Sequence, residues 1–151
     1  MLHSVFKILA GALCLGALLS APASAQSLVG TLKCTADVVK ANQPSRDWKL
    51  ACAFEPVKGQ VQHYAGAIND PGRAPRETGK AFLVWNVLAQ TAEVEPSVLV
   101  GTYKEGKAGA NGLVGGQNGA ILLQAAAGPN PQDGVNVAPR VNAMQLELPR
   151  V

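Results

Sequence analysis

The chain has 151 residues, of which 48% are hydrophobic and 15% charged, and its formal net charge is +3 at neutral pH. This length corresponds to one domain with an ordinary hydrophobic core. The charge is nearly balanced and no cluster of Lys and Arg is present, which argues against nucleic acid as a partner.

Residues 1–25 are predicted to be a cleavable signal peptide. Lys7 precedes the apolar run Ile8–Leu19, and Ala23-Ser24-Ala25 matches the A-x-A cleavage signal. The run is shorter than the roughly 20 apolar residues that a transmembrane helix needs. We therefore expect residues 26–151 to form a single periplasmic or secreted domain, with no transmembrane segment after cleavage.

Two cysteines remain after the predicted cleavage, Cys34 and Cys52. A pair of cysteines in an exported chain predicts a disulfide, which would stabilise the fold by roughly 3 kcal/mol. A metal site would need more ligands, and a redox pair usually has C-x-x-C spacing. Hydrophobic residues alternate with polar ones in 28–38 and 48–54, which puts Leu28 and both cysteines on inward faces of two strands.

Further strands are predicted at residues 60–69, 81–89, 97–104, 120–125 and 141–148, separated by turns rich in Gly, Pro and Asn. The run 81–89 is apolar on both faces, as in a central strand or a short buried helix, and its β-branched and aromatic residues favour the strand. About seven short strands predict an all-β fold, either a single antiparallel β-barrel or a β-sandwich.

Residues 101–124 form the most glycine-rich stretch of the chain, which predicts either a shaped loop or a crowded, sharply bent strand pair. The segment Gly101–Lys107 matches G-x-x-x-x-G-K, but Ala108 stands where a phosphate-binding loop requires Ser or Thr. A nucleotide site is therefore not assigned. The remaining interpretation is a loop that binds an anion or a partner, with the candidate residues Lys104, Lys107, Asn111, Gly115 and Gly116.

Short segments spread over nearly all of residues 26–151 carry a family resemblance. They are Val29–Cys34, Ala51–Phe54, Tyr64–Ile68, Trp85–Ala89, Leu99–Tyr103, Gly109–Gly116, Ile121–Gln124 and Gly134–Ala138. In these segments the chain resembles the exported, mainly alphaproteobacterial family catalogued as domain of unknown function 992. The resemblance implies a periplasmic or secreted protein of similar size, and it supplies no activity and no catalytic residues.

The sequence does not predict an enzyme, because it shows no catalytic motif, no set of metal ligands and no cofactor signature. His63 is the only histidine beyond residue 25, and Glu93 and Glu95 are best interpreted as a solvated loop edge. We expect an envelope protein that acts as a structural or partner-binding module. The alternative is a carrier of a small apolar ligand or lipid, because small barrels can enclose one; its candidate lining residues are Trp48, Phe54, Phe82 and Trp85.

Overall fold

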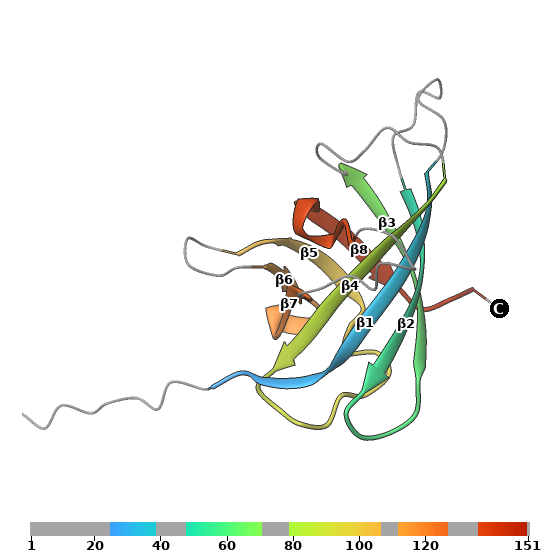
Figure 1. Cartoon of the computed structure of the whole chain (residues 1–151). Helices are drawn as coiled ribbons and strands as arrows, with labels where there is room; N and C mark the ends of the chain where they lie inside the picture. Colours follow the sequence, from blue (N-terminus) through green and yellow to red (C-terminus); the bar gives the residue numbers. More distant parts are fainter. Residues whose placement is uncertain (1–24, 39–47, 71–78, 107–111, 127–135, 151) are drawn as a thin grey trace, which may run out of the picture.

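The computed structural model describes residues 25–38, 48–70, 79–106, 112–126 and 136–150. Within these ranges, eight antiparallel strands close into one barrel (Figure 1). The strands are β1 (Ser27–Val38), β2 (Trp48–Pro56), β3 (Gln62–Asp70), β4 (Gly79–Ala89), β5 (Gly101–Glu105), β6 (Leu113–Gly115), β7 (Ile121–Ala125) and β8 (Ala143–Glu147). Two short 3-10 helices, η1 (Gln117–Gly119) and η2 (Ala138–Arg140), lie between the later strands. The prediction of an all-β fold is confirmed, and the barrel is the alternative that the chain adopts.

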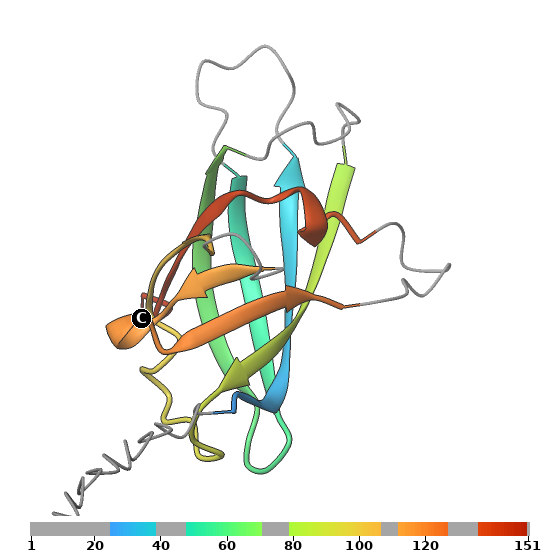
Figure 2. The ribbon, with the colours of Figure 1, turned by 90° about the vertical axis from the view of Figure 1, so that its left-hand side faces the viewer.

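The barrel has two unlike walls. Around its circumference the strand order is β1-β2-β3-β8-β5-β6-β7-β4, so the four longest strands are neighbours and the four short ones are neighbours. Figure 2 shows β5, β6, β7 and β8 crossing the long strands obliquely. We call β4-β1-β2-β3 the long wall and β8-β5-β6-β7 the short wall.

The alternation predicted for β1 holds from Leu32 to Ala36 but fails at its start. Leu28 is 54% exposed, whereas Val29 is only 3% exposed. The register between β1 and β4 shifts between Leu28 and Gly30, which places a bulge at Val29. A bulge adds one residue to a strand and reverses which face the side chains before it occupy. The prediction that Leu28 faces inward is therefore wrong.

Two other predictions concern the middle of the chain. The run 81–89 lies in β4, which pairs with β1 on one side and with β7 on the other. The prediction of a central strand, and not a short buried helix, is therefore confirmed. The strand predicted at 97–104 begins only at Gly101, because residues 96–99 form a turn in which the Val98 N–H donates to the carbonyl of Glu95. No helix in the part of the chain that the structure describes is long and apolar enough to cross a membrane.

Candidate functional site

Large hydrophobic side chains line the interior of the barrel. Trp85, Tyr64, Tyr103 and Phe54 are each at most 2% exposed. Within the described ranges, every buried side chain is hydrophobic by type, and the hydroxyls of Tyr64 and Tyr103 donate hydrogen bonds to backbone carbonyls. Those ranges also contain no group of three His, Cys, Asp or Glu residues that could hold a metal ion. The described interior is thus an apolar core and not a cluster of reactive groups.

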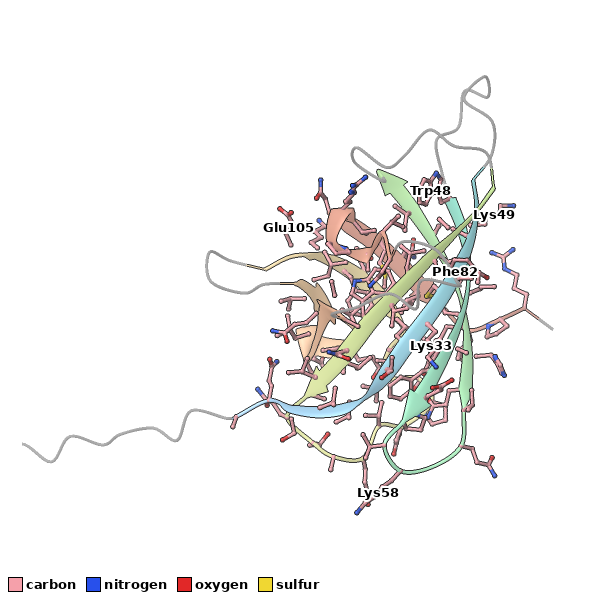
Figure 3. The ribbon with its side chains drawn as sticks, in the orientation of Figure 1. Lys33, Trp48, Lys49, Lys58, Phe82 and Glu105 are labelled. Atoms are coloured by element: carbon pink, nitrogen blue, oxygen red, sulfur yellow. A yellow bond between two sulfur atoms is a disulfide. The ribbon has the colours of Figure 1, made fainter. Side chains whose placement is uncertain are left out.

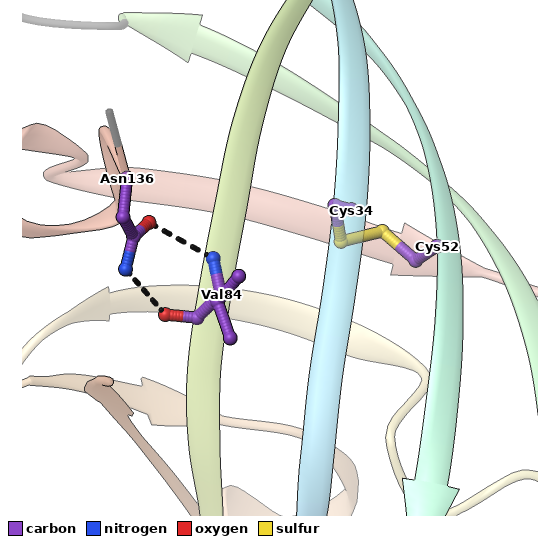
Figure 4. Close-up of a disulfide and its surroundings, with 4 residues drawn as sticks. All are labelled: Cys34, Cys52, Val84 and Asn136. Carbon is purple, nitrogen blue, oxygen red and sulfur yellow. Dashed lines mark hydrogen bonds between the residues drawn. A yellow bond between two sulfur atoms is a disulfide. The ribbon is translucent and has the colours of Figure 1, made fainter. Parts of the chain in front are cut away.

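The predicted disulfide is present inside the long wall. Cys34 of β1 and Cys52 of β2 lie directly opposite each other in the register, with their Cα atoms 4.0 Å apart (Figure 4). On its other side β1 pairs with β4, and Cys34 lies opposite Leu83. The backbone N–H and carbonyl of the next residue, Val84, form hydrogen bonds with Asn136 and Ala126, on the side of β4 away from β1. Successive residues of a strand direct their backbone groups to opposite sides, so those of Leu83 point toward β1. The backbone groups of Cys34 therefore face β4, so that Cys34 and Cys52 form a non-hydrogen-bonded pair. In such pairs the side chains of adjacent strands approach most closely.

The four candidate lining residues do not share one space. Trp48 and Phe54 of β2 and Trp85 of β4 are buried on the inward faces of their strands. Phe82 is only partly buried and lies on the opposite face of β4, since Ala81, Leu83 and Trp85 alternate with it on the inward face. Figure 3 labels Phe82 on β4 and Trp48 near one end of β2.

Two tyrosine hydroxyls hold the connection between β4 and β5 against one end of the barrel. The Tyr103 hydroxyl donates to the carbonyl of Leu99 at 2.7 Å. The Tyr64 hydroxyl donates to the carbonyl of Pro96 and lies 2.7 Å from Gln62 Oε1. Burial raises the pKa of Tyr64 to about 12, and burial together with the nearby Tyr64 raises the pKa of Tyr103 above its ordinary value. Both phenols are therefore neutral hydrogen-bond donors at physiological pH.

In its described part, the glycine-rich stretch forms the predicted bent strand pair and not a shaped loop. This strand pair packs around Tyr103. A Cβ atom on Gly115 would lie 2.8 Å from Tyr103 Cδ1 and 2.3 Å from the carbonyl oxygen of Thr102. Gly116 has a φ of 75°, a conformation that other residues rarely adopt, and it lies beside the Tyr103 hydroxyl. Both candidate glycines thus permit close packing on the aromatic ring.

Of the other candidates in this stretch, Lys104 is exposed on β5, opposite Val114 of β6. Lys107 and Asn111 lie outside the described residues, as does most of the predicted signal peptide. The structure therefore brings Lys104 close to β6 but places Gly115 inside the core, so these two candidates do not form one surface.

Asn136 is a structural residue that sequence reasoning missed. Its side-chain amide pairs with the edge of β4 as a strand residue would: the Val84 N–H donates to Oδ1 at 2.9 Å, and Nδ2 donates to the Val84 carbonyl at 3.0 Å (Figure 4). Nδ2 also donates to the carbonyl of Ala126, and Oδ1 accepts from the Ala138 N–H. The pairing between β4 and β7 ends at Trp85, so Asn136 continues the ladder past that point. A single asparagine among turn residues gives no pattern that predicts this role.

The remaining polar groups are spread over the outer surface. Lys33 and Glu55 form an exposed ion pair of 2.8 Å between β1 and β2. His63, Glu93 and Glu95 are also exposed. Glu93 and Glu95 lie in the irregular connection before β5 and not on an extended strand, as expected for a solvated loop edge.

Searches for similar proteins found no match among curated proteins and none among solved structures. The family model described as a protein of unknown function (DUF992) matches residues 15–147. This span includes all eight strands, the disulfide and Asn136. The resemblance seen in the short sequence segments is therefore confirmed over most of the chain, which belongs to the DUF992 family.

Proposed function

We propose that the protein is an exported, non-enzymatic envelope protein that acts through its outer surface, as a structural or partner-binding module. The observation that carries this proposal is the contrast between the interior and the surface. Trp85, Tyr64, Tyr103 and Phe54 belong to one buried hydrophobic cluster, whereas the charged side chains of the described residues lie outside it. The outer strand faces, the ends and the connections are therefore the parts of the barrel that offer polar groups to a partner.

Export is supported by two features of the chain. The first is the signal-peptide pattern of residues 1–25. The second is the Cys34–Cys52 disulfide, because disulfides persist in oxidising compartments such as the periplasm. Both features favour a periplasmic or secreted location.

A carrier of a small apolar ligand is the second candidate. Trp48, Phe54 and Trp85 all face inward, which gives the barrel an aromatic interior. A bound ligand would lie against these side chains and would add its mass to that of the protein. The two candidates therefore predict different masses for the protein purified from its host.

The decisive experiment is native mass spectrometry, under non-reducing conditions, of the protein purified from the periplasm of its host. Our proposal predicts the mass of residues 26–151 less two hydrogens. An additional mass that dissociates on activation would favour the carrier and would identify the class of ligand. A mass that includes residues 1–25 would refute cleavage of the signal peptide.

Partner binding is then tested by affinity purification from envelope extracts, with the Lys104→Glu/Lys107→Glu variant and the unchanged protein as baits. Lys49→Glu is the matched control, because Lys49 is an exposed lysine on the outer face of the long wall. If the glycine-rich stretch binds the partner, the double variant loses a protein that the Lys49→Glu variant retains. An identical set of captured proteins would exclude this stretch as the binding surface.

A further inference from the structure

One end of the barrel exposes a group of apolar side chains. Leu28, Val57 and Val61 are 54%, 66% and 52% exposed, and they are three of the five large hydrophobic side chains that are exposed in the described residues. We call these three residues the apolar end. The N–H of Val57 donates to the carbonyl of Val29, next to Leu28, and Val61 lies across the β2–β3 turn from Val57.

Charges of both signs lie near the apolar end. Lys58 lies in the same turn, between the two valines, and Figure 3 shows it at the tip of the barrel. Glu93 and Glu95 flank Val94, whose carbonyl accepts a hydrogen bond of 3.2 Å from Gln62 Nε2, one residue from Val61. The only ion pair between described residues is Lys33–Glu55, so these three charged groups have no partner of opposite charge there.

Figure 1 shows the β2–β3 turn, the start of β1 and the connection between β4 and β5 together at the same end of the barrel. The surface therefore combines exposed apolar side chains with one basic and two acidic groups. In a two-fold dimer the same patch of each subunit faces its counterpart, so the patch must be complementary to itself. A patch that carries both signs of charge beside its apolar side chains offers the opposite charges that this requirement needs.

We propose that the apolar end is a self-association surface, which binds a second copy of this chain in an isologous contact. Val57, Val61 and Leu28 of the two copies pack against each other, and Lys58 of each copy lies opposite Glu93 and Glu95 of the other. This surface is separate from the glycine-rich stretch, so self-association does not depend on any envelope partner. Glu93 and Glu95 would be repelled by an anionic bilayer, whereas a second copy offers Lys58 as a basic partner for this acidic pair.

The test measures self-association of the protein obtained by expressing the full chain, with its N-terminus determined by mass. The patch is small, so sedimentation velocity is expected to show a reversible monomer–dimer equilibrium with a dissociation constant of roughly 10–100 μM. The Val57→Ser/Val61→Ser variant is expected to remain monomeric over the same range. Leu148→Ser is the matched control, because Leu148 is 50% exposed but lies outside the apolar end, and it should leave the equilibrium unchanged.

Charge reversal tests the geometry separately from the apolar contact. Lys58→Glu and Glu93→Lys/Glu95→Lys are each expected to weaken dimerisation about fivefold or more, because each places like charges opposite one another. An equimolar mixture of these two variants should form heterodimers more tightly than either variant forms homodimers.

Three results would overturn the proposal. The first is a monomer at every concentration, and the second is a dimer that survives the two serine substitutions. The third is flotation of the monomer with phosphatidylglycerol vesicles that is lost in the Val57→Ser/Val61→Ser variant, which would assign this end to a membrane surface. The circular dichroism spectrum of each variant confirms that it is folded before these results are compared.

Discussion

Replacing Asn136 by alanine tests whether one side chain completes the barrel. The Asn136 amide makes four hydrogen bonds, two with Val84 and one each with Ala126 and Ala138. Its loss removes the acceptor of the Val84 N–H, at the point where β4 no longer pairs with β7. An unsatisfied, partly buried backbone group costs about 1–3 kcal/mol, and a typical hydrogen bond contributes about 1 kcal/mol net.

Because Asn136 is only partly buried, water can replace some of the lost bonds, and we expect Asn136→Ala to lower the free energy of unfolding by about 2 kcal/mol. The measurement is urea unfolding with the disulfide intact, followed by circular dichroism. At a slope of about 2 kcal/mol per molar urea, the midpoint should fall by about 1 M with the slope unchanged.

Asn86 provides the matched control, since it is also a partly buried asparagine and lies on β4, two residues beyond Val84. In the described part of the chain its side chain makes no hydrogen bond, so Asn86→Ala should change stability by less than about 0.5 kcal/mol. Equal losses in the two variants would refute the view that Asn136 acts as a strand residue for β4.

Three further predictions follow from the core. Replacing Cys34 and Cys52 together by alanine should lower the free energy of unfolding by roughly 3 kcal/mol, measured against the oxidised protein; no loss would mean that the bridge does not constrain the unfolded chain. For Tyr64 the folded pKa of about 12 lies above the ordinary 10.0, so the stability that its burial confers is complete below pH 10 and is lost as the pH rises through 12. Unfolding measured from about pH 9 to about pH 12 should therefore show a decline that is shallower in Tyr64→Phe, and parallel curves would contradict the assignment. Gly115→Ala should destabilise the fold by about 1–3 kcal/mol, because a Cβ at Gly115 meets the Thr102 carbonyl and the Tyr103 ring. Gly119→Ala is the comparison for backbone strain alone, since Gly119 has a φ of 65° and no atom lies within 4 Å of its Cβ. A thermal midpoint for Gly115→Ala no lower than that for Gly119→Ala would contradict the packing argument.

The sequence predicts the long wall well, and the reason is periodicity. The alternation of apolar and polar residues along β1 and β2 is enough to indicate the strands, their inward faces and the position of the disulfide. It fails at Leu28, because a bulge reverses the alternation there. Gly30, a glycine inside the strand pattern, is the signal that could have indicated the bulge. Barrel and sandwich present the same alternation, so only the closure of β4 onto β7, and of β3 onto β8, separates them.

The short wall resists prediction because its contacts are not periodic. β6 has only three residues and lies within a glycine-rich stretch that disfavours strand assignment. The roles of Gly115 and Asn136 depend on groups far along the chain or across the barrel, such as the Tyr103 ring and the edge of β4. Such contacts are visible only once the strands are in register.

The two walls are stabilised by different means, and this difference bears on where the protein can bind. β1 pairs with β4 along nearly its whole length and is linked to β2 by the disulfide. By contrast, β5 and β6 pair through only Lys104–Val114 and Glu105–Leu113, and the short wall relies on buried anchors such as Tyr103. Gly115 and Gly116, the glycines that lie beside Tyr103, are needed for this packing. A high glycine content therefore does not by itself indicate a display loop here, and the apolar end, whose two valines are more than half exposed, is the stronger candidate for a binding surface.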